Sequence, residues 1–331
     1  MSCWGRDVDE LVVHARQGQA RAVARLISLI EDGAPQLRAL AAALAPDSGR
    51  AQVVGITGPP GVGKSSTVSV LVTALRAGGK RVGVLAVDPS SPFSGGALLG
   101  DRVRMQEHAT DAGVFIRSMA TRGHLGGIAW ATPQALRVLA AAGCDEVLVE
   151  TVGVGQSEVE VAALADTTVV MLAPGMGDGI QAAKAGILEV ADVFVVNKAD
   201  REGADQTVRD LKHLISLGRR GTAGPSWRPP VVRTVATKAA GIEELVGAIE
   251  EHRAWMSSHG ELEARRQRRA EAEVEAIALA HLHGRLGDAL RGSALPGLAK
   301  RVVAGELDVY RAADELIAEL VAQPPAAGTR V

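Results

Sequence analysis

The strongest constraint on the fold is a glycine-rich segment at residues 58–65, which reads Gly-Pro-Pro-Gly-Val-Gly-Lys-Ser. It follows an apolar run at 52–57 and precedes a stretch of helical character. A glycine, four variable residues and Gly-Lys-Ser form the P-loop pattern, in which backbone amides bind phosphate oxygens. The sequence therefore predicts a nucleotide phosphate site between a strand and a helix.

The residues of this loop have distinct expected roles. The predicted phosphate-binding residues are Gly58, Pro59, Pro60, Gly61, Val62, Gly63, Lys64, Ser65 and Ser66. The glycines let the backbone curl so that its amides point at phosphate oxygens, and the following helix adds the positive end of its dipole. Lys64 is expected to reach the β- and γ-phosphates as a catalytic charge, and the Ser65 hydroxyl is expected to ligate Mg²⁺.

Short apolar runs alternate with helical stretches after this loop. The predicted strands are 52–57, 82–87, 147–149, 168–172, 193–196 and 231–235. Continuous apolar strands separated by helices are typical of a parallel sheet that is buried on both faces. We therefore expect an α/β fold, a P-loop domain at 49–256 with a mostly parallel central sheet covered by helices.

Helical patterns flank this domain on both sides. Residues 1–48 are expected to form an N-terminal helical extension, since apolar residues recur there at helical spacing. Residues 257–331 are expected to form a C-terminal helical arm, with a long helix at 257–290 and a second at about 306–322. Apolar residues four apart predict one apolar face on the long helix; they are Val274, Ala278, Leu282, Leu286 and Leu290.

A second motif, Asn-Lys-Ala-Asp at 197–200, directly follows the apolar run at 193–196. Guanine offers two neighbouring donors that one carboxylate can accept, whereas adenine would leave that carboxylate desolvated and unpaired. Asp200 fits this role, Asn197 is expected to bond the other edge of the base, and the stem of Lys198 to cover a ring face. Ala236, Thr237 and Lys238 follow the run at 231–235 and are expected to present a backbone amide to guanine O6, although the usual Ser-Ala-Lys is not matched.

Carboxylates stand at the ends of two predicted strands. Asp88 ends the run at 82–87 and Glu150 ends the run at 147–149, while Asp101 lies in the loop region between them. Ligands of open α/β sheets bind off the carboxyl ends of the strands, so these acids are expected to face the phosphates. Each of the three is a candidate for holding Mg²⁺ directly or through water, and one of them for orienting the attacking water.

Two glycine-rich segments are candidates for nucleotide-responsive loops. In the segment 153–156, Gly153 is expected to offer its amide to the γ-phosphate and Gln156 to touch the attacking water. The segment 175–179 has Lys184 just beyond it. Plain connecting turns are the alternative for both segments.

Composition narrows the class of function. The formal net charge is −2 and aromatic residues make up 2% of the chain, which argues against a basic nucleic-acid binder with stacking rings. The first residues lack the apolar core of a signal peptide, and no run of about 18 apolar residues occurs. We therefore expect a cytoplasmic protein that binds neither nucleic acid nor membrane.

Several other residues suggest structural roles. The Arg265–Arg269 cluster is interspersed with glutamates, which indicates a solvated charged helix rather than an anion site. Trp227 is expected to be a packing anchor. Cys144 precedes a strand and is expected to be an inert core thiol.

Five segments together resemble the MeaB/ArgK family of P-loop GTPases, relatives of the human methylmalonic aciduria type A protein. They are GITGPPGVGKSS, VDPSSPFSGGALLGDRVRM, VFIRSMATRGHLGG, VETVGVGQSE and NKAD. The resemblance covers nearly the whole chain, and the second and third segments are long and unusual.

This resemblance implies a GTP-hydrolysing chaperone of an adenosylcobalamin-dependent acyl-CoA mutase, chiefly methylmalonyl-CoA mutase. Such a protein gates cofactor loading from a cobalamin adenosyltransferase and protects or reactivates the mutase. The resemblance further implies GTP/GDP and Mg²⁺ as cofactors, weak intrinsic hydrolysis stimulated by the partner, and a homodimer formed through the C-terminal arm.

Carried over by position, the resemblance makes Asp88, Asp101 and Glu150 the acids near Mg²⁺. It makes Asp178 and Lys184 part of a switch that faces the mutase, and Arg104 a further candidate for stabilising charge.

Other functions remain open at this point. One is a GTPase that delivers another metal or serves another cobalamin enzyme, although Cys3 and Cys144 show no metal-binding spacing. A second is a kinase of a basic amino-acid transport system, which needs a base for a hydroxyl acceptor. A third is a scaffold that uses nucleotide only to fold.

Overall fold

The computed structural model describes residues 8–88, 105–120, 131–151, 157–175, 190–217, 226–291 and 294–322. The chain divides into two compact units, Met1–Arg266 and Gln267–Val331. The finer predicted division at residues 48 and 256 stays a prediction.

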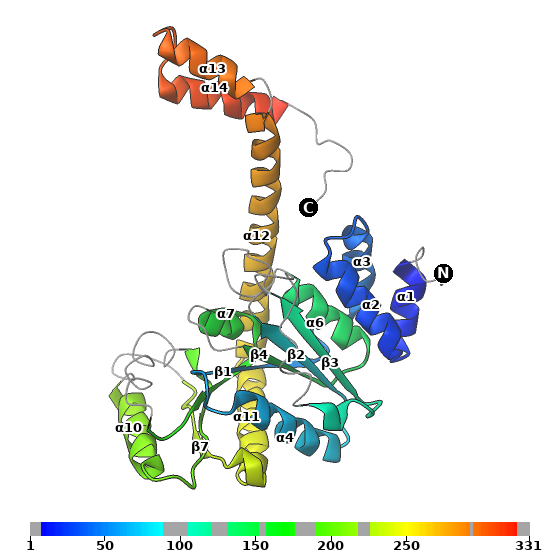
Figure 1. Cartoon of the computed structure of the whole chain (residues 1–331), viewed down its shortest axis with the longest axis vertical. Coiled ribbons are helices and arrows are strands. Elements are labelled where there is room, and N and C mark those ends of the chain that lie inside the picture. Colours follow the sequence, from blue (N-terminus) through cyan, green and yellow to red (C-terminus); the bar gives the residue numbers. More distant parts are fainter. Residues whose placement is uncertain are drawn as a thin grey trace. The chain divides into compact units, whose positions relative to one another are not determined.

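A seven-stranded sheet forms the centre of the first unit (Figure 1). Its strands are β1 (Gln52–Thr57), β2 (Val82–Asp88), β3 (Val114–Ala120), β4 (Glu146–Thr151), β5 (Thr167–Leu172), β6 (Val193–Val196) and β7 (Val231–Arg233). The strand order is β3-β2-β4-β1-β5-β6-β7, and every neighbouring pair runs parallel. The predicted α/β class with a parallel sheet is confirmed.

Sequence patterns missed the edge strand β3. Its seven residues place two polar residues, Arg117 and Ser118, in the middle of an apolar run. The Arg117 guanidinium bonds the Ser28 hydroxyl at 3.0 Å and pairs with the Glu31 carboxylate, both on a neighbouring helix. These two partners outside the sheet allow a charged residue to lie in the strand. Because Arg117 interrupts the apolar pattern, the sequence alone did not predict β3.

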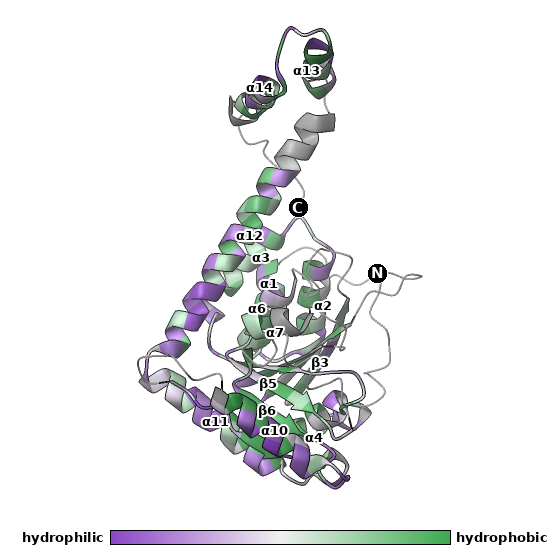
Figure 2. Ribbon diagram, turned by 90° about the vertical axis from the view of Figure 1, so that its left-hand side faces the viewer, coloured by the Kyte–Doolittle hydropathy of each residue, from purple (hydrophilic) through white to green (hydrophobic). Residues whose placement is uncertain are grey.

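Helices cover both faces of the sheet. They are α4 (Lys64–Ala77), α6 (Thr132–Ala141), α7 (Ser157–Leu164), α10 (Ala204–Leu217) and α11 (Ile242–Ser258). Alternate residues of β1 enter different clusters: Val54 packs with residues of α4 and α11, and Val53 with residues of α6 and α7. In Figure 2 the sheet is largely green, whereas the helices around it also carry purple, hydrophilic residues.

Three helices precede the sheet: α1 (Val8–Arg16), α2 (Ala20–Glu31) and α3 (Leu37–Leu44). Leu26 and Ile30 of α2 are fully buried and belong to the same core cluster as α6. Asp47, only 1% exposed, accepts hydrogen bonds from Arg16 at 2.7 and 3.0 Å. The predicted N-terminal helices are therefore present and share a core with the sheet.

The C-terminal helices are α12 (Glu261–Arg291), α13 (Ala294–Val303) and α14 (Val309–Ala322). The prediction of one helix from residue 257 was wrong at its start, because α11 continues to Ser258 and Gly260 adopts a φ of 73° before α12 begins. Helix α13 was not predicted, and it contacts α14 within the second unit. Among the residues described, no helix combines the length and apolar character needed to cross a membrane.

Cys144 provides a test of this core. The residue is 3% exposed, and burial raises the pKa of its thiol to about 12 despite the opposing effect of Arg81. Thiolates, not thiols, react with alkylating agents. In a Cys3→Ser variant, we expect iodoacetamide at pH 8 to label Cys144 only after unfolding, as followed by mass spectrometry. Rapid stoichiometric labelling of the native protein would contradict this burial.

Candidate nucleotide-binding site

The glycine-rich loop connects β1 to α4 at the carboxyl edge of the sheet. Gly58 has a φ of 143°, and a Cβ atom at this position would lie 2.2 Å from the Met171 carbonyl oxygen of β5. Gly63 immediately precedes α4 with a φ of 95°. A Cβ atom at Gly63 would lie 2.5 Å from Asn197 Nδ2. Both positions require glycine, because a neighbouring residue leaves no room for a side chain and the positive φ disfavours one.

Lys64 lies inside the loop. It is 7% exposed, and its ammonium donates to the carbonyl oxygens of Gly58 at 2.7 Å and Pro59 at 3.2 Å. The loop's own backbone thus holds a positive charge at the start of a helix, where the helix dipole also favours anions. Pro60, Gly61 and Ser66 are exposed around it. This arrangement suits a polyphosphate.

Ser65 and Glu150 meet although they lie far apart in the sequence. The Ser65 hydroxyl donates to Glu150 Oε1 at 2.6 Å, and the two residues are 7% and 1% exposed. Ser65 lies in the first turn of α4, and Glu150 lies near the carboxyl end of β4, which pairs with β1. A hydroxyl and a carboxylate are the hard oxygen ligands that Mg²⁺ prefers, so this donor set fits the expected metal.

The segment after β6 is attached to the glycine-rich loop through Asn197. This side chain is 3% exposed and donates from Nδ2 to the Val62 carbonyl oxygen at 2.8 Å. Its Oδ1 accepts from the Ala236 amide and the Thr234 hydroxyl, each at 3.1 Å. Lys198, with a φ of 56°, donates from Nζ to the Gly61 carbonyl oxygen at 2.6 Å. The structure therefore brings three predicted segments to one place.

Asp200 lies on the exposed side of this cluster. Lys238 Nζ lies 3.0 Å from Asp200 Oδ2, and the hydrogen bond from that ammonium lowers the pKa of the carboxyl below its usual range. Asp200 is therefore an ionised acceptor at neutral pH. Ala236 is buried, whereas Thr237 and Lys238 are exposed, and all three form the short 3₁₀ helix that follows β7.

Other predicted site residues lie outside the described part of the chain. These are Asp101, Arg104, Gly153, Gln156, Asp178 and Lys184. Asp88 is the last residue of β2, and its side chain is also outside the description. Their roles stay predictions.

Two features of the first unit escaped sequence analysis. Thr234 is 1% exposed and its hydroxyl donates to Asn197 Oδ1. Within the predicted strand 231–235 nothing sets this threonine apart. The interpretation of the Arg265–Arg269 cluster as a solvated face was wrong for its first two members. Arg265 pairs with Asp192 at 2.7 Å and Arg266 with Asp166 at 2.8 Å, because both carboxylates lie at the amino edge of the sheet beside α12.

Residues 23–290 match the family described as methylmalonyl-CoA mutase-associated GTPase MeaB. The chain belongs to the MeaB family. Its members are P-loop GTPases, which agrees with the glycine-rich loop between β1 and α4.

Individual relatives extend over most of the chain. It is 48% identical over 314 residues to a Pyrococcus abyssi protein whose name describes a GTPase, with 95% of this chain and 97% of that protein covered. It is 36% identical to the mouse methylmalonic aciduria type A homolog, covering 94% of this chain and 79% of that protein. A crystal structure of an LAO/AO transport system kinase matches with a TM-score of 0.68 and 26% identity, covering 98% of this chain and 100% of that one.

Two glycines of the loop provide a matched pair of variants for this MeaB-family site. In Gly58→Ala the new methyl meets the Met171 carbonyl oxygen, whereas in Gly61→Ala it meets no atom within 4 Å although φ is 79°. We expect Gly58→Ala to weaken GDP binding at least about tenfold, and Gly61→Ala to retain more of it, since only backbone strain of about 1 kcal/mol is added there. Calorimetric titration with GDP measures both. Equal losses would contradict the packing argument.

Proposed function

We propose that this protein hydrolyses GTP slowly and, through a nucleotide-dependent contact, controls cofactor loading of an adenosylcobalamin-dependent acyl-CoA mutase, most directly methylmalonyl-CoA mutase. The single observation that carries the nucleotide part is the hydrogen bond from Asn197 to the Val62 carbonyl oxygen at 2.8 Å. This bond joins the glycine-rich loop at 58–65 to residues 197–200, whose Asp200 suits guanine. The family description supports the mutase as client.

In this proposal different residues bind the phosphates, the base and the metal. The loop amides and Lys64 bind the β- and γ-phosphates, and Lys64 stabilises the charge that develops as the γ-phosphate leaves. Asp200 accepts the two guanine donors, while Asn197 keeps that segment against the loop. Ser65 and Glu150 would hold Mg²⁺, which when bound neutralises charge on the phosphate oxygens.

The remaining predicted roles complete the cycle. Asp88 and Asp101 share the magnesium environment, Gly153 and Gln156 sense the γ-phosphate and its water, and Arg104 adds positive charge. Asp178 and Lys184 belong to the loop that reports the nucleotide state to the mutase. A cobalamin adenosyltransferase would supply the cofactor in the cytoplasm.

A kinase is the second candidate, because the LAO/AO transport system kinase has a similar structure. A kinase that uses ATP has no need of a carboxylate that accepts two donors from the base. Asp200 therefore favours GTP, and the choice can be made by experiment.

The proposal is tested by phosphate release from GTP and from ATP, each with and without purified methylmalonyl-CoA mutase. We expect slow release from GTP, several-fold acceleration by the mutase and no release from ATP. Lys64→Ala should reduce release on the order of 100-fold, since one charge that stabilises the transition state is removed. Equal use of ATP would contradict the guanine site and favour the kinase. If the mutase does not change the rate of phosphate release from GTP, the GTPase activity stands and this mutase is rejected as the client.

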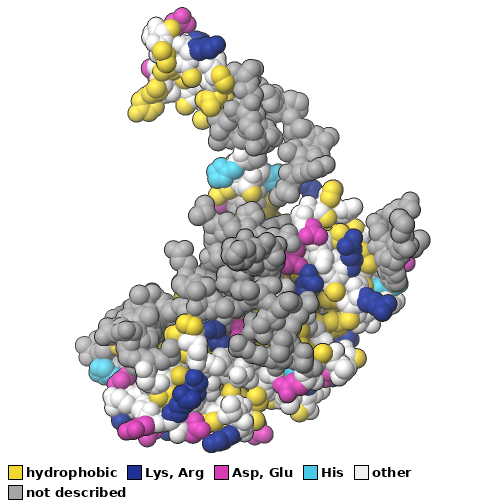
Figure 3. All heavy atoms as spheres, in the orientation of Figure 1, with side chains coloured by type: hydrophobic (Ala, Val, Ile, Leu, Met, Phe, Trp, Pro, Cys, Tyr) yellow, Lys and Arg dark blue, Asp and Glu magenta, His cyan; other side chains and the backbone are white. Residues whose placement is uncertain are grey.

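We also propose that the C-terminal helices form a homodimer. Large apolar side chains of the second unit are exposed to solvent in the single chain. Figure 3 shows hydrophobic side chains gathered on α13 and α14. The exposed residues are Val274, Ile277, Leu279, Leu282, Leu295, Val303, Val309, Tyr310 and Ile317. Exposed apolar patches of this kind mark interaction surfaces.

Light scattering tests the dimer. Val303 is 90% exposed and Tyr310 is 81% exposed, so replacing both with Asp should affect association more than folding. We expect a dimer mass for the wild type and for the control Lys300→Glu on exposed polar α13 surface, and a monomer mass for Val303→Asp/Tyr310→Asp. A monomeric wild type at micromolar concentration would reject the dimer.

A further inference from the structure

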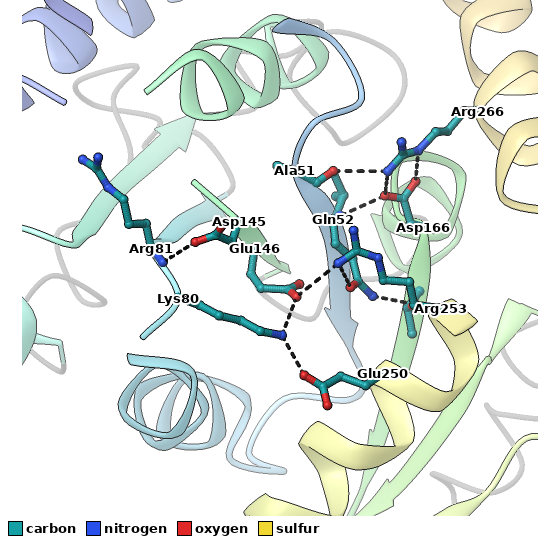
Figure 4. A network of polar contacts seen from close by, with 12 residues as sticks. Ala51, Gln52, Lys80, Arg81, Asp145, Glu146, Asp166, Glu250, Arg253 and Arg266 are labelled. Atoms are coloured by element: carbon teal, nitrogen blue, oxygen red, sulfur yellow. Dashed lines mark hydrogen bonds and ion pairs between the residues drawn. The ribbon is translucent and has the colours of Figure 1, made fainter. Parts of the chain in front are cut away.

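Two arginines at the start of α12 bind the residues that directly precede β1, β5 and β6. Arg266 donates to the Asp166 carboxylate at 2.8 and 3.2 Å and to the Ala51 carbonyl oxygen at 3.2 Å, as Figure 4 shows. Arg265 forms a bidentate pair with Asp192 at 2.7 and 3.0 Å and also donates to the Asp166 carbonyl oxygen. Asp166 and Asp192 directly precede β5 and β6.

Asp192 is a junction of several elements. Its side chain is 9% exposed and accepts the Thr168 amide of β5 at 2.8 Å. His252 of α11 lies 3.3 Å from Asp192 Oδ1, and the Trp227 indole donates to the Asp192 carbonyl oxygen at 2.7 Å. Burial alone would raise the pKa of this carboxyl, but the hydrogen bonds from His252 and Arg265 lower it below its usual range. Arg265 therefore faces a buried carboxylate that is ionised.

Strand β6 connects this junction to residues 197–200, the proposed guanine-binding segment. It contains four residues, Val193–Val196, each at most 1% exposed, and Asn197 follows at once. Four residues span roughly 13 Å at about 3.3 Å each. Because β6 is paired with β5 on one side and β7 on the other, a shift at Asp192 has little room to be absorbed before it reaches Asn197.

We propose that the Arg265–Asp192 pair is a positioning interaction for the proposed guanine site. The start of α12 and residues 197–200 are then energetically coupled through β6. This inference rests on the proposed GTP-binding function. Its physical basis is preorganisation: a strand fixed at its amino end presents Asn197 and Asp200 already in place, and less ordering is left for the nucleotide to induce. An ordinary structural ion pair would affect stability without altering which base is preferred.

Arg265→Gln tests the coupling, with Arg209→Gln as the matched control. Arg209 lies on the exposed surface of α10, and its guanidinium donates to Gln206 Oε1 of the same helix. We would measure the Kd values of GDP and of inosine diphosphate, whose base lacks the 2-amino group. The expected result for Arg265→Gln is GDP binding about fivefold weaker or more and a reduced GDP preference, with neither change in the control. Unchanged GDP affinity and unchanged preference in folded Arg265→Gln would overturn the proposal.

Hydrogen exchange on the wild type provides a test that needs no variant. Coupling is reciprocal, so GDP should slow amide exchange at residues 261–266 as well as at 197–200. Protection at 197–200 alone would overturn the coupling while leaving guanine binding intact. If the wild type binds no GDP at all, the proposed function itself fails, which separates the two outcomes.

Discussion

The buried amide of Asn197 is the interaction on which the rest of the nucleotide site depends. Its nitrogen donates to the glycine-rich loop at Val62, and its oxygen accepts from Thr234 and Ala236 beyond β7. Leaving such buried partners unsatisfied costs about 1–3 kcal/mol for each group. One side chain thus attaches the segment that carries Asp200, the proposed guanine acceptor, to the glycine-rich loop.

The two edges of the sheet have different tasks. At the carboxyl edge, the side chains of Lys64, Ser65 and Glu150 lie together at the glycine-rich loop. This is the edge at which open parallel sheets bind their ligands. At the amino edge, the carboxylates of Asp166 and Asp192 form ion pairs with Arg266 and Arg265 of α12. These pairs attach the first turns of α12 to the sheet. The short buried strand β6 joins these edges, which gives a helix outside the nucleotide site a physical route to it.

The parts of the fold that depend on local sequence patterns could be predicted. The loop at 58–65, the apolar strands and the Asn197 segment each combine a motif with its flanking structure, so their placement could be predicted. Strand β3 could not, because Arg117 interrupts its apolar run and finds its partners on α2. The paired state of Arg265 and Arg266 was equally hidden, since nothing local to α12 reveals the carboxylates that precede β5 and β6.

A crystal structure of the protein with GDP and Mg²⁺ tests the central claim most directly. The account predicts the β-phosphate inside the loop at 58–65, the metal beside Ser65 and the guanine edge against Asp200, with the contact between Asn197 and Val62 retained. A nucleotide bound elsewhere on the sheet, or a base turned away from Asp200, would contradict it.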